Sequence, residues 1–118
     1  MATKLNLKIN QGETYRHAIT WKDAATDLPI NITGYSGRMH IRGTVASVTT
    51  YVELTTENNG LLITDAVNGE LTIYMSDSTT TGFNWYAGVY DLELIAPNGG
   101  DVFRVIEGSV SVKKEVTR

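Results

Sequence analysis

Residues 88–112 form two β-rich arms around a tight turn, and this stretch constrains the fold more than any other. Val, Ile, Leu, Tyr and Phe fill both arms, and Pro-Asn-Gly-Gly at 97–100 interrupts them. A four-residue turn pairs Ala96 with Asp101. Counting back from it sets three further pairs: Leu94 with Phe103, Leu92 with Val105, and Glu93 with Arg104. One face of the hairpin is then apolar, and the other carries an opposite-charge pair that adds about 0.2–1 kcal/mol. This apolar face fixes the register, because a slip of one residue would turn it to water.

The rest of the chain alternates apolar and polar residues in short runs, which is typical of half-buried strands. These runs cover residues 3–9, 14–21, 35–42, 51–55, 61–64 and 70–75. Turn signals separate them, including Glu57-Asn58-Asn59-Gly60 and Asn68-Gly69. Ser76–Thr81 is polar and predicts one helical turn capped by its serine. The apolar phase changes after Ile106, which predicts a β-bulge at Gly108.

About eight strands with regularly spaced turns predict an all-β, antiparallel sandwich or barrel. We expect one domain over residues 1–118, since this is an ordinary length for a single core. Tyr90 precedes Leu92 by two residues at the start of a strand. The tyrosine corner of immunoglobulin domains has this layout, with a cysteine where Leu92 stands. The chain contains no cysteine, so we predict an immunoglobulin-like sandwich without a disulfide, held by apolar packing.

Composition argues against several classes of partner. The formal net charge of −3 lacks the basic excess of a nucleic-acid binder, so we expect no nucleic acid. No apolar run approaches the roughly 20 residues of a membrane helix, and we expect no membrane contact. The N-terminal Met-Ala-Thr-Lys lacks the apolar segment of a signal peptide. The absence of cysteine fits synthesis in the cytoplasm.

No pattern of reactive side chains indicates an enzyme. His17 and His40 lie inside predicted strands. Such residues can serve as metal ligands or general bases, but we favour a core-edge His17 and a solvent-facing His40. The carboxylates of the predicted loops lack the spacing of a calcium or glycosidase site, and we expect them to be solvated: Asp23, Asp27, Asp65 and Asp77. We therefore predict no catalytic residue, no metal site and no cofactor.

Phe83, Trp85 and Tyr86 form an aromatic cluster on a predicted connection. Such side chains can stack on sugar rings or anchor a protein partner. They can equally cover the open end of a sandwich core. We favour coverage or a subunit interface over a carbohydrate site, and take the three residues as candidate partner contacts.

Several segments together resemble a family of small bacteriophage virion proteins with an immunoglobulin-like domain, similar to the N-terminal domain of baseplate upper proteins. The opening INQGETYRHAITW at 9–21 is similar to the first two strands of that family. The other similar segments are INITGYSGRMHIR at 30–42, LTTENNGLLI at 54–63, GVYDLELIAPNGGDVFRVIEGSVSV at 88–112 and the closing KKEVTR at 113–118. Baseplate upper proteins continue into a helical or fibre-forming region, whereas this sequence ends at Arg118.

The resemblance implies a non-enzymatic structural subunit of the virion, in the tail, the baseplate or the fibre attachment. It also implies contacts with other virion proteins of the tail, baseplate, fibre or capsid, a homo-oligomer in the particle, and synthesis in the host cytoplasm. Two alternatives stay open: a capsid decoration protein, and a carbohydrate-binding module that uses Phe83, Trp85 and Tyr86.

Overall fold

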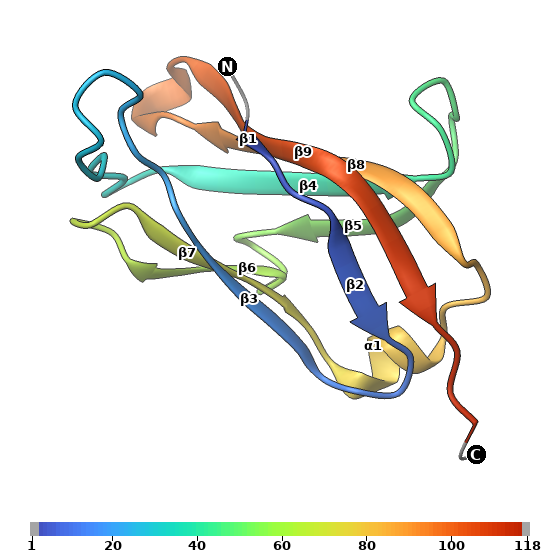
Figure 1. Ribbon diagram of the computed structural model, residues 1–118. Coiled ribbons are helices and arrows are strands. Elements are labelled where there is room, and N and C mark those ends of the chain that lie inside the picture. The colour runs from blue at the N-terminus through green and yellow to red at the C-terminus, as the bar shows by residue number, and fades with distance from the viewer. Residues whose placement is uncertain (1–2, 117–118) are drawn as a thin grey trace.

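The computed structural model describes residues 3–116 and shows two β-sheets packed face to face (Figure 1). The all-β prediction is therefore confirmed. In chain order the elements are β1 (Thr3–Lys4), β2 (Leu7–Asn10), β3 (Tyr15–Thr20), β4 (Ser36–Arg42), β5 (Thr50–Thr55), β6 (Leu61–Asp65), β7 (Glu70–Met75), α1 (Asp77–Thr81), β8 (Ala87–Ile95), the 3₁₀ turn η1 (Pro97–Gly99) and β9 (Val102–Lys113). The last two residues of the KKEVTR segment, 117 and 118, lie outside the described part.

The larger sheet has the strand order β1-β9-β8-β4-β5, and β2 also pairs with β9. Its central strands are antiparallel, as predicted. The first two strands differ, since β1 and β2 run parallel to β9. The predicted single strand over residues 3–9 is also interrupted at Leu5 and Asn6, where Asn6 Oδ1 accepts the Ser109 amide at 3.2 Å. That side-chain bond takes the place of a main-chain one and separates β1 from β2.

The smaller sheet has the order β3-β7-β6 and is antiparallel throughout. The β6–β7 hairpin turns at Asn68 and Gly69, as the Asn-Gly pair predicts, and Gly69 adopts a positive φ of 69°. A shift of register between Ile63 and Asp65 marks an irregularity in β6.

The β8–β9 hairpin has the predicted turn but a bulge at a different residue. The Ala96 amide donates to the Asp101 carbonyl at 2.9 Å, and Leu94 pairs with Phe103 as predicted. Leu92, however, pairs with Ile106 rather than with Val105. Val105 is the extra residue of the bulge, because it has no partner between the pairs Leu92–Ile106 and Glu93–Arg104. Gly108, where the bulge was expected, pairs regularly with Tyr90. The extra residue allows the adjacent Val105 and Ile106 both to be buried.

The space between the sheets is filled by one cluster of buried apolar side chains. Rows of fully buried residues alternate along the strands: Met39 and Ile41 on β4, Leu71, Ile73 and Met75 on β7, and Leu92 and Leu94 on β8. At one end α1 is capped by Ser76, whose Oγ accepts the Thr79 amide at 3.2 Å, as predicted. No helix in residues 3–116 is long and apolar enough to span a membrane.

Candidate partner-contact surfaces

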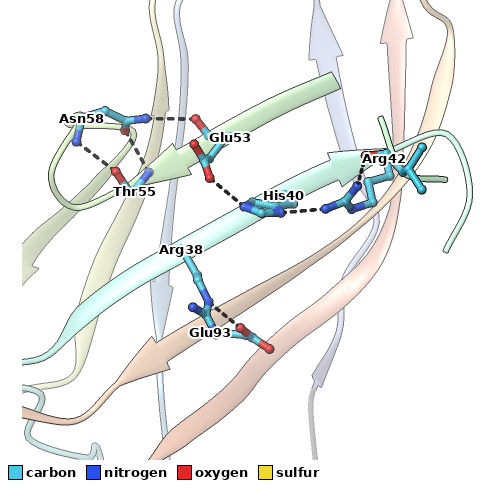
Figure 2. Close-up of polar contacts among 8 residues, drawn as sticks. Arg38, His40, Arg42, Glu53, Thr55, Asn58 and Glu93 are labelled. Atoms are coloured by element: carbon cyan, nitrogen blue, oxygen red, sulfur yellow. Dashed lines mark hydrogen bonds and ion pairs between the residues drawn. The ribbon is translucent and has the colours of Figure 1, made fainter. Parts of the chain in front are cut away.

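The two histidines lie on different sheets. The His17 ring is half-buried on β3 and stacks on Tyr15 with 6.4 Å between ring centroids. His40 lies on β4, where its Nε2 is 2.9 Å from Glu53 Oε2 (Figure 2). Within the described residues no group of three or more His, Asp or Glu side chains is placed to hold a metal ion.

The outer face of the larger sheet carries a row of polar contacts (Figure 2). One Arg42 nitrogen, Nη2, lies 3.2 Å from His40 Nδ1, and Nη1 donates to the carbonyls of Ser47 and Val48 at 3.0 Å. Since Arg42 can only donate, His40 Nδ1 accepts and its Nε2–H donates to Glu53. The row therefore fixes the tautomer of His40 and ties residues 43–49, with the exposed Val48, back to β4.

Ion pairs on this face connect different residues from those predicted. Glu93 and Arg104 are opposite each other in register, yet Glu93 receives the Arg38 Nε at 2.7 Å. Arg104 instead lies 3.5 Å from Asp91 and 3.6 Å from Glu107. Both side chains thus have other partners, and the expected cross-strand pair does not form. These partly exposed pairs each contribute at most about 1 kcal/mol.

Tyr90 does not form the predicted tyrosine corner. Its hydroxyl donates to the Leu5 carbonyl at 2.6 Å, 85 positions away, instead of to a main-chain group just upstream. The bond holds the interruption between β1 and β2 against β8. Burial raises the pKa of Tyr90 well above its ordinary value, and the neighbouring Tyr15 adds to the rise. The buried Tyr90 is therefore a structural hydrogen-bond donor.

The three candidate contact residues separate in the structure. Phe83 and Trp85 are buried, with 4.9 Å between their ring centroids, and Tyr51 stacks on Trp85 at the same distance. Tyr86 is 69% exposed. Phe83 and Trp85 cover the end of the core, so Tyr86 is the member of the cluster that another molecule can reach.

Two residues that the sequence reasoning missed hold this end of the molecule. Lys114 Nζ lies 4.7 Å from the centroid of the Tyr86 ring and donates to the Phe83 carbonyl at 2.8 Å. Gln11 Nε2 donates to the same carbonyl at 2.9 Å. These contacts join segments more than 30 and 70 positions apart, so no local sequence signal could have identified them. Lys114 thus lies against the Tyr86 ring, and both residues line a concave surface of about 610 Å³.

Asn58 closes the free edge of β5 (Figure 2). Its Nδ2 donates to the Glu53 carbonyl at 3.0 Å, and its Oδ1 accepts the Thr55 amide at 2.8 Å. The carboxamide thus takes the place of the main-chain groups of a neighbouring strand. It protects this part of the edge from pairing with another chain.

The fold is similar to that of a phage protein domain. No protein-family model matches the sequence, and no curated protein matches it. Among solved structures, the N-terminal domain of phage TP901-1 ORF48 is similar with a TM-score of 0.54 and 16% identity. The match covers 94% of this chain and 95% of that chain.

The similarity concerns the fold alone, since only 16% of residues are identical. The similar part of ORF48 is its N-terminal domain. The resemblance to a phage protein domain, inferred from sequence segments, is therefore confirmed at the level of the fold.

Proposed function

We propose that this protein is a non-enzymatic structural subunit of a bacteriophage particle, in the tail, the baseplate or the fibre attachment. The observation that carries the proposal is the fold shared with a phage protein domain over almost the whole length of both chains. In this role the chain is made in the host cytoplasm, assembles as a homo-oligomer in the particle, and acts through contacts with other virion proteins.

The strand order supports an immunoglobulin-like sandwich for this subunit. With β1 and β2 taken as one interrupted strand, residues 3–116 contain eight strands. The order β9-β8-β4-β5 corresponds to strands G-F-C-C′ of an immunoglobulin domain, and β3-β7-β6 corresponds to B-E-D. Where immunoglobulin domains use a disulfide between sheets, this chain places buried apolar residues, including Leu92.

The surface chemistry also supports a structural role. The polar side chains Arg38, His40, Glu53 and Glu93 pair across strands, Arg38 with Glu93 and His40 with Glu53 (Figure 2). The exposed Tyr86, contacted by Lys114, has the properties of an interface anchor, since tyrosine is enriched among the residues that dominate interfaces. We assign Tyr86 as the contact residue of this end of the molecule.

Localisation in the intact particle tests the proposal. We expect quantitative mass spectrometry of purified phage to find the chain in multiple copies, and antibody labelling in electron micrographs to place it at the tail or baseplate. Labelling of the head surface would instead indicate capsid decoration and overturn the tail assignment. Absence from purified particles would overturn the whole proposal.

A further inference from the structure

One edge of the smaller sheet presents main-chain groups that no other part of the described chain binds. β3 pairs with β7 alone. The Trp21 amide donates to the Gly69 carbonyl at 2.9 Å, and the Tyr74 amide donates away from β3, to the Gly60 carbonyl at 2.8 Å. In an antiparallel pair, residues alternate between bonding the neighbour and facing away from it. The register therefore directs three β3 peptide groups to the free edge: those of Arg16, Ala18 and Thr20.

A groove of about 470 Å³ runs along this edge. β3 lines one side of it, and Leu5, Val105 and Ile106 of the larger sheet contribute to the other. The Trp21 ring packs 5.2 Å from that of Phe103, so the end of β3 lies opposite β9. Thr3 of β1 and the adjacent Leu5 also line the groove, so a chain that entered it would lie between β3 and these residues of the larger sheet's edge.

The inward-facing side chains of β3 are incompletely covered. Tyr15, His17 and Ile19 are only half-buried. Their register partners on β7 are fully buried: Met75, Ile73 and Leu71. A further strand beside β3, with apolar side chains at every second position, would cover this row in the same way.

The edges formed by β5 and β6 are less open than that of β3. Asn58 occupies the edge of β5, and a shift of register interrupts β6. β3 by contrast pairs with β7 over all six of its residues without a bulge. Regular, unprotected edges of this kind are the templates on which extended peptides add as strands.

We propose that β3 accepts an extended segment of another virion protein as a fourth strand of the smaller sheet. The segment hydrogen-bonds to the main chain of Arg16, Ala18 and Thr20, and its alternate apolar side chains enter the groove. That the segment belongs to a virion protein rests on the proposed function; the strand site itself rests on the geometry of β3.

A peptide with the β7 sequence, Glu-Leu-Thr-Ile-Tyr-Met, is a suitable probe, because β7 is the strand that β3 already pairs with. We expect its addition to the full chain to slow hydrogen exchange at the amides of Arg16, Ala18 and Thr20, measured by NMR. A peptide of the same composition without alternation, Leu-Ile-Met-Glu-Thr-Tyr, serves as the control. No protection up to the solubility limit of the peptide, or equal protection by the control, would overturn the site. So would loss of protection at the β7 amides of Leu71 and Ile73, which pair with β3 in the native sheet, since it would mean that the peptide displaces β7.

Substitution at the free edge gives an independent readout. Ala18→Pro removes an outward N–H and leaves the β3–β7 bonds in place, so we expect peptide binding to weaken about tenfold or more. Ala18→Ser keeps the N–H and should bind as the parent chain does. If Ala18→Pro fails to fold by circular dichroism, Thr20→Pro at the end of β3 is the replacement. Unchanged binding in a folded proline variant would contradict the proposal.

The two proposals fail separately. The peptide titration uses the isolated chain, so a negative result removes the strand site and leaves the virion assignment standing. Absence of the chain from particles removes the virion assignment and leaves any measured strand addition unaffected.

Discussion

Tyr90 joins β8 to the first strands of the chain through a single hydroxyl. Tyr90→Phe keeps the buried ring but leaves the Leu5 carbonyl without its donor. We expect the free energy of unfolding in urea to fall by about 1–3 kcal/mol. Tyr86→Phe, at an exposed ring, is the matched control and should change it by less than about 0.5 kcal/mol. Equal effects of the two substitutions would contradict the structural role of the Tyr90 hydroxyl.

The same hydroxyl predicts a loss of stability in alkali. Burial raises the pKa of Tyr90 in the folded chain, so the folded state holds the phenol neutral. The associated stability is fully present below about pH 10, the ordinary tyrosine pKa, and is lost as the pH rises above it, because the unfolded chain then ionises. We expect the unfolding free energy to fall above that pH, and to fall less steeply in Tyr90→Phe. Parallel pH profiles would contradict the assignment.

Gly108 is required where β9 passes the interruption between β1 and β2. A Cβ at this position would collide with the Leu5 carbonyl and lie 3.1 Å from Asn6 Oδ1. We expect Gly108→Ala to destabilise the fold by about 1–3 kcal/mol in urea unfolding. Gly82→Ala is the control: its Cβ would meet nothing closer than 3.6 Å, and Gly82 has a helical φ of −76°. It should be neutral or slightly stabilising.

Individual residues show what the sequence could and could not reveal. The alternation of apolar and polar residues around Met39 and Ile41 correctly predicts that both point into the core. Successive side chains of a strand point to opposite faces, so this property can be read from neighbouring residues alone. Phe83, Trp85 and Tyr86 look alike in the sequence. Their different burial depends on Tyr51 and Lys114, which are distant along the chain.

At the scale of the element, the carboxamide of Asn58 substitutes for a neighbouring strand at the edge of β5. Asn58→Ala removes its bonds to the Glu53 carbonyl and the Thr55 amide. We expect a loss of about 1–3 kcal/mol in urea unfolding, together with concentration-dependent self-association in sedimentation velocity as the edge opens. Asn68→Ala, which removes only a bond to the exposed Asp65 carboxylate, should do neither.

The hairpin shows why element register is harder to predict than element type. Pro97–Gly100 identified the turn, and the first pairs beyond it follow from counting. Val105 and Ile106 are both apolar, so the sequence does not show which one breaks the alternation. In the sequence the glycine at 108 suggests a bulge. In the structure a glycine is needed there because β9 passes close to Leu5. A non-local contact thus determines what a local pattern leaves undecided.

At the scale of the whole molecule, the fold could be inferred from several sequence segments taken in their order along the chain. None of these segments alone is specific for the fold. Their order and spacing reflect the sequence of strands and turns, which the shared fold preserves at 16% identity. The groove beside β3 could not be inferred in this way. It depends on how β3 lies against Leu5, Val105 and Ile106, and no residue pattern within β3 records that juxtaposition.

The absence of cysteine from the chain allows its surfaces to be mapped in the particle. Tyr86→Cys and Val67→Cys each introduce a single thiol, at positions 69% and 65% exposed. In the isolated protein we expect both to react with a thiol reagent at similar rates. In assembled particles the rate at residue 86 should fall by roughly tenfold or more, since a side chain at the centre of an interface is shielded from solvent.

Val67→Cys, at the β6–β7 turn, reports whether the particle as a whole restricts the reagent. A fall in rate at residue 86 relative to residue 67 therefore measures contact at the Tyr86 end itself. Equal rates at the two positions in the particle would remove Tyr86 from the interface. The contacts that hold the subunit in place would then have to come from other surfaces, among them the open edge of β3.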